Sequence, residues 1–373
     1  MGALPDPLVS VGYTNETLTD FTLGDATDSV LMFSWTQEVP YPGKRRLSGD
    51  VARSEIEVVR QDLDAVHLTV RAEVKTAYAE IFRLDRTRTI LEESRKLLES
   101  FLETARRRYE SGEGILENVL KAQTELMRLD TDLVILAQER RGVEVVLNAL
   151  LGRPTDAPQG PALVPPRAEN LDRASLEQAA LERSPELGSL RASARREEVR
   201  LDLARKNLKP DFMWTASYGY RGSLDPMVVG MVGVRLPLYR RNKQAEAVVQ
   251  TEYELLAAQR DVESLEVRTL AEVRDLVART ESARLQMRLY AEGLLPQARS
   301  ALDSAAASYA VGRTEFVTVI EDFLSLLEFE QDYEMQRAGE AAALAALEPL
   351  TGIALLVPAG GAGEASPGEE THE

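Results

Sequence analysis

Y-E-S-G-E-G-I-L-E-N-V-L-K-A-Q, the stretch from Tyr109 to Gln123, decides the fold because a second stretch of the same design follows it in the chain. The second stretch is Y-A-V-G-R-T-E-F-V-T-V-I-E-D-F, from Tyr309 to Phe323, and its tyrosine and first glycine lie 200 residues after those of the first. The same interval separates L-N-A-L-L-G, which ends at Gly152, from L-E-P-L-T-G, which ends at Gly352. A shared interval of this kind is typical of a duplicated unit. We therefore predict two tandem repeats with equivalent Tyr-x-x-Gly turns.

The composition favours long helices over a compact enzyme. Charged residues make up 28% of the 373 residues and aromatic residues only 6%, which is typical of coiled coils. The net charge of −17 argues against a nucleic-acid partner, because phosphate contacts need clustered positive charge. With no cysteine in the chain, disulfides, thiolate chemistry and Cys-ligated metals are excluded.

The sequence indicates neither a transmembrane helix nor a signal peptide. No segment reaches the roughly 18 to 20 consecutive apolar residues of a membrane helix. The opening M-G-A-L-P-D-P has neither a charged n-region nor an apolar h-region, so we expect no export signal in the chain as given.

Two pairs of strands are predicted, over residues 8–39 and 211–238. In the first pair, apolar and polar residues alternate from Val9, and a polar loop separates them from a second run, Val30 to Val39. In the second pair, residues 212–220 and 228–238 are joined by R-G-S-L-D-P-M. These lengths are near the 9 to 11 residues of a tilted membrane strand. A small soluble hairpin is the alternative.

Each strand pair is followed by a short run of basic residues, called here the basic step, and then by a long helical hairpin. The two helical hairpins cover residues 48–152 and 245–352. Apolar residues recur every seven positions in the first rod, at Leu63, Val70, Ala77, Leu84, Leu91, Leu98 and Ala105. This repeat predicts a left-handed coiled coil. Gly112 and Gly114 then turn the chain back.

The domain boundaries follow from these segments. Residues 1–152 form the first repeat, which lacks a leading helix, and residues 171–356 form the second, led by a helix over 171–208. Residues 153–170 are a linker rich in Pro, Gly and Ala, and residues 357–373 are predicted to be a disordered acidic tail.

Four strands are too few to close a barrel, and open sheet edges are not tolerated in lipid. Closure therefore requires several copies, and three chains would supply twelve strands, within the known size range. The order of P-D-x, strand pair ending in x-P, basic step, long helix, Y-x-x-G turn, V-L-x-A-Q and closing L-x-x-L-x-G resembles the TolC family of outer membrane efflux proteins. The resemblance covers residues 5 to about 354.

The resemblance implies a mainly α fold with a β-barrel part: a homotrimer with a 12-stranded transmembrane barrel in the outer membrane and a helical tunnel in the periplasm. It also implies a channel without catalysis or cofactors, loaded by a periplasmic adaptor and an inner membrane pump. The opening A-L-P-D-P and Q-E-V-P-Y-P-G-K-R resemble the branch of the family that works with metal-cation or related proton-driven exporters, which implies an RND pump rather than an ABC pump. A coiled-coil scaffold of the cell envelope is the alternative from another class.

The resemblance places the pore constriction at the second tip. Two acidic positions three residues apart line the narrowest point in this family, and they fall on Thr318 and Glu321. Thr318 departs from the acidic pattern, so Glu321, helped by Asp322 or Glu315, would supply one carboxylate per chain. Three carboxylates around a threefold axis select cations, and an ordinary solvated Glu is the alternative.

The gate and the adaptor contacts are also expected at the tips. Tyr309 matches a gate residue that bonds a polar partner on the first tip. That partner is Asn118, where the family can have Asp, so the bond would be neutral. The residues expected to contact the adaptor are Tyr109, Gly112, Gly114, Gly312 and Arg313.

Catalytic and metal sites are not indicated. The chain has two histidines, His67 on a helix and His372 in the tail, and neither has the partners of a triad or a zinc site. The triplet Arg106-Arg107-Arg108 is interpreted as a solvated face near the first tip, with contact to the adaptor as the alternative.

Overall fold

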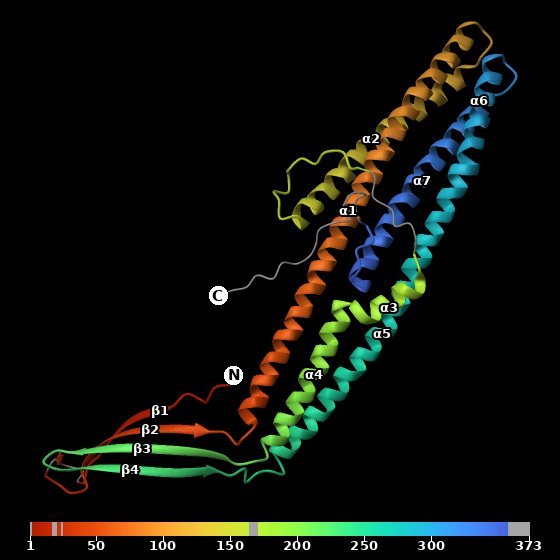
Figure 1. The fold of residues 1–373 in the computed structure, drawn as a ribbon. Coiled ribbons are helices and arrows are strands. Elements are labelled where there is room, and N and C mark those ends of the chain that lie inside the picture. The colour runs from red at the N-terminus through yellow and green to blue at the C-terminus, as the bar shows by residue number, and fades with distance from the viewer. Residues whose placement is uncertain (1, 17–20, 24, 164–170, 357–373) are drawn as a thin grey trace, which may run out of the picture. The chain divides into compact units, whose positions relative to one another are not determined.

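The computed structural model describes residues 2–16, 21–23, 25–163 and 171–356. The chain is mostly helical with one small antiparallel sheet, and it divides into two compact units (Figure 1). Unit 1 comprises Met1–Asp62 with Glu186–Glu266, and unit 2 comprises Leu63–Pro185 with Val267–Glu373. The predicted acidic tail, residues 357–373, and part of the predicted linker lie outside the described residues.

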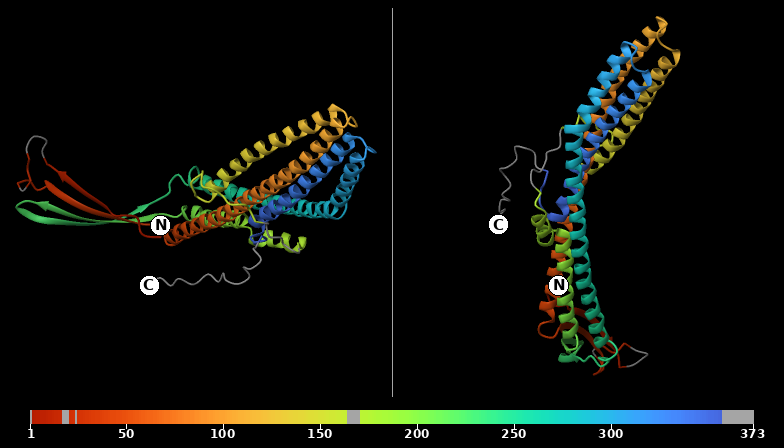
Figure 2. Two further views of the ribbon diagram at one scale, coloured as in Figure 1. Left: turned by 90° about the horizontal axis from the view of Figure 1, so that it is seen from above. Right: turned by 90° about the vertical axis from the view of Figure 1, so that its right-hand side faces the viewer.

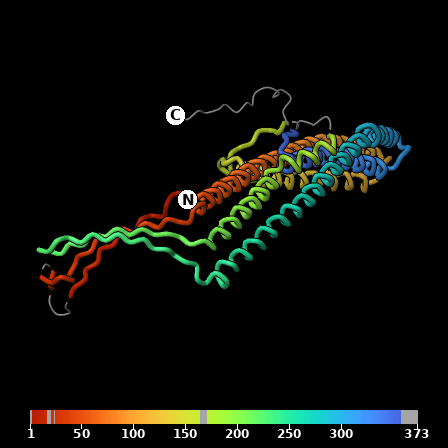
Figure 3. Tube along the Cα trace, turned by 60° about the horizontal axis from the view of Figure 1, so that its bottom comes forward, coloured from red at the N-terminus to blue at the C-terminus, as the bar shows by residue number. Residues whose placement is uncertain are grey.

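The sheet of unit 1 is built from two hairpins that are far apart in the sequence. The strands are β1 (Leu8–Thr14), β2 (Val30–Val39), β3 (Asp211–Arg221) and β4 (Leu224–Arg235), in the order β1-β2-β3-β4. Figure 3 shows the two hairpins side by side. The helices between β2 and β3 in the chain therefore bring the second hairpin back beside the first, and β1 and β4 are left as the edges.

One face of the sheet is apolar, and the other carries polar side chains together with apolar ones such as Leu8 and Met231. In the register, Val11 faces Phe33, Phe33 faces Tyr218, and Tyr218 faces Val228. These four side chains are 45–79% exposed, and none of them is buried. On the opposite face, Ser34 bonds Ser217 at 2.9 Å and Thr36 bonds Thr215 at 3.0 Å. A sheet with a wide exposed apolar face needs an apolar environment or partner to cover it.

The second hairpin turns earlier than the sequence indicates. The predicted strand over 228–238 is wrong at both ends, since β4 begins at Leu224 and ends at Arg235. The tight turn lies at Gly222, whose φ of 63° suits glycine. Pro226 is accommodated because β4 is an edge strand, where a missing N–H is tolerated.

The long helices are α1 (Lys44–Glu110), α2 (Leu116–Leu150), α5 (Gln244–Leu289), α6 (Leu295–Ala310) and α7 (Phe316–Thr351). Helix α1 starts earlier than the predicted residue 48, because the backbone already turns at Gly43, with φ 95°. The basic step is therefore the first turn of the helix rather than a connection before it. In unit 2, α2 runs beside α1, and α7 runs beside α6 (Figure 2).

The seven-residue apolar series of α1 is buried only in part. From Ala77 to Ala105 its members are at most 9% exposed, whereas Leu63 is 54% and Val70 is 36% exposed. The buried part packs with apolar residues of α2, α6 and α7 into the main core of unit 2. The same seven-residue apolar series is therefore buried where other helices of the chain pack on it. It stays exposed where the chain supplies no such helix.

The second rod contains a π-helical turn, η1 (Tyr290–Leu294), between α5 and α6. The first arm of the hairpin predicted over 245–352, expected as one helix to about Ala310, is therefore not a continuous α-helix. A π turn inserts one extra residue, and it is held by the Tyr290 hydroxyl, which donates to Asp332 Oδ2 at 2.9 Å.

The predicted leading helix, residues 171–208, is two helices, α3 (Arg173–Arg183) and α4 (Pro185–Lys206). The break lies at Ser184, which is extended with φ −60° and ψ 120°. A residue before proline is disfavoured in the helical region, so Pro185 ends α3 and begins α4.

Helix α3 is attached to α5 by a carboxylate shared between two arginines, and this predicts a pH effect. Arg274 donates to both oxygens of Glu177, at 2.9 and 3.1 Å, and Arg173 donates at 2.8 Å. These bonds, those of Arg274 first, lower the pKa of Glu177 to about 2. The stabilisation is therefore complete above the unfolded pKa near 4.5 and is lost as the pH falls through about 2.

The measurement compares the thermal midpoints of wild type and Glu177→Gln across this range. We expect wild type to be more stable at pH 5 and above, and the difference to vanish near pH 2. A difference that did not depend on pH would contradict the assignment.

No helix within the described parts of the chain is both long enough and apolar enough to cross a membrane.

Candidate functional site

The candidate site lies in unit 2, where the chain reverses at both Tyr-x-x-Gly turns. Each glycine takes a left-handed conformation, with φ 78° at Gly112 and 73° at Gly312. Its N–H bonds the carbonyl of the preceding tyrosine at 3.0 Å in both turns. The next residue closes the helix end with a bond of 2.9 Å, from Glu113 to Arg108 and from Arg313 to Ser308. The two reversals are thus built from the same hydrogen bonds.

Gly114 is required for another reason. A Cβ placed on it would lie 3.1 Å from the backbone of Arg108 and Tyr109. The N–H of Gly114 also bonds the Arg108 carbonyl at 2.9 Å. This glycine allows the chain to pass close over the end of α1.

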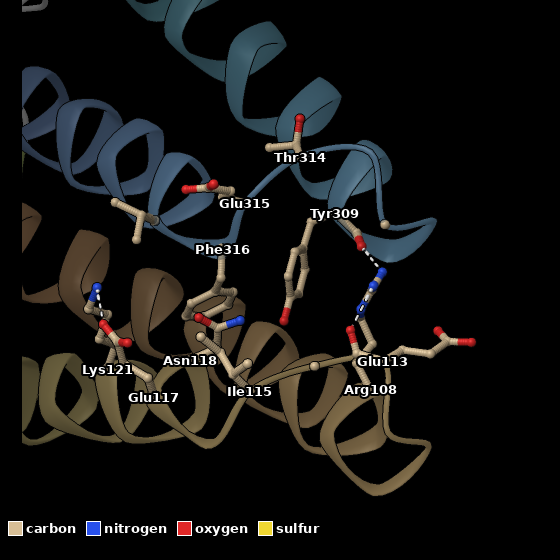
Figure 4. Close-up of a pocket in the computed structure, with 13 residues that line it drawn as sticks. Arg108, Glu113, Ile115, Glu117, Asn118, Lys121, Tyr309, Thr314, Glu315 and Phe316 are labelled. Carbon is tan, nitrogen blue, oxygen red and sulfur yellow. Dashed lines mark hydrogen bonds and ion pairs between the residues drawn. The ribbon is translucent and has the colours of Figure 1, made fainter.

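Arg108 connects the two tips. Its Nη1 donates to the carbonyl of Tyr309 and its Nη2 donates to the carbonyl of Glu113 at 3.3 Å. The guanidinium also lies over the Tyr309 ring, 5.1 Å from its centroid. A Cβ on Gly312 would lie 2.9 Å from Arg108 Nη2. One side chain therefore holds the first tip against the backbone and the ring of the second (Figure 4).

A pocket of about 340 Å³ opens between the tips. It is lined by Arg108, Asn118 and Tyr309, and by the charged residues Glu113, Glu117, Lys121 and Glu315. Two buried polar atoms there, Arg108 Nε and the Tyr309 hydroxyl, have no hydrogen-bond partner in the described part of the chain. Figure 4 shows the hydroxyl directed toward Asn118, but no hydrogen bond joins them. The predicted gate pair is therefore brought to one pocket without being bonded.

The two tip tyrosines differ in burial although they are equivalent in sequence. Tyr309 is 5% exposed and packs on Phe316, with ring centroids 5.1 Å apart, whereas Tyr109 is 46% exposed. Phe316 belongs to the main core, as does Phe323, which meets Phe101 edge to face. The second tip is thus anchored by aromatic residues, and the first presents its tyrosine to solvent.

The predicted constriction residues lie on the exposed side of α7. Thr318 and Glu321 are exposed and Asp322 is half-buried, and no hydrogen bond or ion pair holds their side chains among the described residues. Their neighbours Val319 and Ile320 are buried. The helix therefore turns its apolar side inward and leaves Glu321 free to face solvent or another copy.

The interpretation of the arginine triplet needs correction. Arg106 and Arg107 are exposed, as a solvated face requires, but Arg108 is half-buried between the tips. The sequence contains a weak signal for this role, since Arg108 directly precedes the tyrosine of the turn. Its acceptor on the second tip, the Tyr309 carbonyl, lies about 200 residues away, so periodicity along α1 could not reveal it.

Within the described ranges, no three His, Asp or Glu side chains form a group that could hold a metal ion. His67 is exposed on α1.

Comparison with protein families identifies one that matches most of the chain. The family described as "Outer membrane efflux protein" matches residues 8–153 and 176–353. These ranges include both strand pairs, both helical hairpins and both tips. No curated protein sequence matches the chain significantly.

Solved structures of outer membrane channels share the fold. The outer membrane protein VceC of Vibrio cholerae aligns with a TM-score of 0.80 and 18% identity, over 94% of this chain and 87% of that one. The CmeC channel of Campylobacter jejuni aligns with a TM-score of 0.77 and 13% identity, over 94% and 78%. The MtrE channel of Neisseria gonorrhoeae, solved in its open state, aligns with a TM-score of 0.71 and 17% identity, over 95% and 82%. At these identities the comparison supports the fold, and the residue roles must come from the geometry.

Proposed function

Because the chain belongs to the outer membrane efflux protein family, whose members are channels rather than enzymes, we propose that it forms the outer membrane duct of a tripartite export system. The active form is a homotrimer with a 12-stranded barrel and a helical tunnel that extends into the periplasm. Solutes pass down an aqueous path, and the helical tips control access.

The observation that carries this proposal is the two-faced sheet with two open edges. Its exposed apolar face includes Trp35, Trp214 and Val232, while the other face carries hydrogen-bonded pairs of Ser and Thr residues. Alternation of apolar and polar residues along each strand is the pattern of a membrane barrel with a polar interior. Because an open edge cannot be left in lipid, β1 and β4 require partner strands from other copies.

The registers of the two hairpins support a tandem duplication. The Pro-Asp before β1 precedes the Pro-Asp before β3 by 205 residues, and the apolar-Pro pair after β2 precedes the one after β4 by 197. The interval of 205 carries Leu8 to Met213, and the interval of 197 carries Thr36 to Gly233. Leu8 faces Thr36 in the first hairpin, and Met213 likewise faces Gly233 in the second. We therefore propose repeats over 1–152 and 171–356, joined by the linker 153–170.

The tips are proposed as the periplasmic entrance. Arg108 holds them together, Tyr309 and Asn118 form the gate, and Glu321 with Thr318 and Asp322 lines the constriction. The adaptor would meet the exposed positions Tyr109, Gly112, Gly312 and Arg313, together with the half-buried Gly114. An inner membrane pump, of the proton-driven RND type rather than the ABC type, supplies the energy.

The test is purification in mild detergent followed by planar-bilayer recording. We expect a heat-modifiable trimer that produces single-channel currents. A coiled-coil scaffold would produce neither, so a monomer without conductance would overturn the proposal.

Charge selection at the constriction has its own prediction. Glu321→Gln is expected to lower the cation-to-anion permeability ratio severalfold, because it removes the charge from each chain at the narrowest point. Reversal potentials under a salt gradient measure the ratio.

Glu328→Gln is the matched control. It makes the same charge change at an exposed position of α7 two turns further from the tip, and its effect is expected to be smaller. Equal effects at both positions would mean that Glu321 does not line the constriction.

A further inference from the structure

One buried ion pair joins the start of α1 to the start of β3 in unit 1. Lys44 Nζ lies 2.8 and 3.0 Å from the two carboxylate oxygens of Asp211, and it also donates to the carbonyl of Lys209 at 2.9 Å. Asp211 accepts a further bond from the Tyr41 N–H at 2.8 Å. The two charged side chains are only 8% and 21% exposed. This junction holds the helix that follows β2 against the strand that pairs with β2.

The same junction is incomplete at the outer edges of the sheet. The interval of 205 residues carries Asp211 back to Asp6, just before β1, and the interval of 197 carries Lys44 forward to Arg241, just after β4. Both residues are exposed, and neither has an ion pair or side-chain hydrogen bond among the described residues. They lie on opposite edges of the sheet, so one chain cannot bring them together.

We propose that Asp6 of one copy pairs with Arg241 of the next, and that β4 and β1 join between copies in the register of β2 and β3. The inference rests on the proposed oligomer and specifies its interface. The interval of 197 carries a β2 residue forward to β4, and the interval of 205 carries its β3 partner back to β1. Trp35 faces Ala216 within the chain, so Val232 of one copy would lie opposite Val11 of the next. Likewise Leu236 faces Pro7, because Val39 faces Phe212.

The charged residues and the apolar side chains at the two sheet edges both fit a second copy of this chain as the partner. The step after β4 contains Arg240, Arg241 and Lys243, and the segment before β1 contains Asp6. On the strands themselves, Val11 is 61% and Val232 is 60% exposed. Directly opposed residues have Cβ atoms about 4.5 to 5.5 Å apart and pack together. The interface therefore combines an apolar strand pair with one ion pair at its helical end.

The pairing also explains why both charges are present. Once covered like Lys44, either Asp6 or Arg241 alone would be a buried charge without a partner, which is strongly destabilising. An arginine can bind a carboxylate through two parallel hydrogen bonds. The ion pair thus disfavours neighbouring copies that are shifted along the edge.

The first experiment exchanges the two charges in the full-length chain. Asp6→Arg and Arg241→Asp are each expected to reduce the trimer fraction at least tenfold in mild detergent, and the double variant is expected to restore most of it. Arg240→Asp is the matched control, because it makes the same change one residue away and has no equivalent in the Lys44 junction. Failure of the double variant to recover trimer would overturn the ion pair.

The second experiment tests the register by disulfide formation in this cysteine-free chain. Val11→Cys with Val232→Cys is expected to give covalent dimers and trimers on oxidation, which reduction reverses. Within one chain, β1 and β4 are three strand spacings apart, about 14 Å, beyond the reach of a disulfide.

Two further cysteine pairs serve as controls. Trp35→Cys with Ala216→Cys is the equivalent pair inside the chain and should cross-link without forming oligomers. Val11→Cys with Val228→Cys is displaced by four residues, about 13 Å along the strand, and should not cross-link.

The outcomes separate this inference from the proposed function. If wild type is a trimer but only the displaced pair cross-links, the register is wrong while the channel proposal stands. If wild type is a monomer without conductance, the proposed function fails and the interface with it.

Discussion

Lys44→Met is expected to lower the free energy of unfolding by about 3 to 5 kcal/mol, the cost of leaving one partner of a buried ion pair alone. The variant would leave the Asp211 carboxylate, whose side chain is 21% exposed, without its cation. It would also remove the donor to the Lys209 carbonyl. The junction between β2, β3 and α1 would loosen at the point where the strands meet the helices. Urea unfolding at a fixed protein concentration measures the effect.

The double variant Lys44→Met with Asp211→Asn is the informative control. It removes both charges but keeps an acceptor for the Tyr41 N–H, so most of the lost stability should return. Arg45→Met changes an exposed neighbour and is expected to cost less than about 0.5 kcal/mol. If the double variant were no more stable than Lys44→Met, the buried charge would not be the cause.

Arg108→Ala is expected to increase the open fraction of the proposed channel roughly tenfold or more. The substitution removes two hydrogen bonds from a charged donor, each worth about 1.5 to 3 kcal/mol, and the contact with the Tyr309 ring, worth about 0.5 to 2 kcal/mol. The bond to the Tyr309 carbonyl and the contact with the Tyr309 ring join the two tips in each chain, so their loss favours separation. The bond to Glu113 lies within the first tip. Conductance of purified trimers in planar bilayers is the measurement.

Arg107→Ala is the matched control, because that neighbouring arginine is exposed and has no side-chain bond among the described residues. Its conductance should equal that of wild type. Arg108→Lys is expected to be intermediate, since lysine keeps the charge but lacks the planar fork that reaches two acceptors. An Arg108→Ala trimer with wild-type conductance would show that Arg108 does not hold the tips closed.

The tips also show how far inference from the sequence reaches. Gly112 and Gly312 could be assigned to helix reversals because a left-handed residue at a helix end is a local requirement. The expected contact between Tyr309 and Asn118 brought together the right segments, but the structure has no hydrogen bond between the two side chains. The missed residue was Arg108, whose acceptor at Tyr309 is remote in the sequence.

Other differences have equally specific causes. The break at Ser184 follows from Pro185, a local signal that could have been used. The π turn at Tyr290 could not be predicted from spacing alone, because its support is the bond to Asp332 on α7. The exposure of Leu63 within an unbroken heptad series depends on which helices the chain itself supplies.

The sequence by itself determined the repeated order of strand pair, long helix and glycine turn, and the alternation that makes one face of the sheet apolar. These properties are periodic or local, so they can be read along the chain. Only the tertiary structure decided which of two equivalent residues is buried, as with Tyr309 against Tyr109, and which charges are paired, as with Lys44 against Arg241. The physical reason is that burial and pairing depend on contacts between distant segments, and the two proposed repeats meet different neighbours.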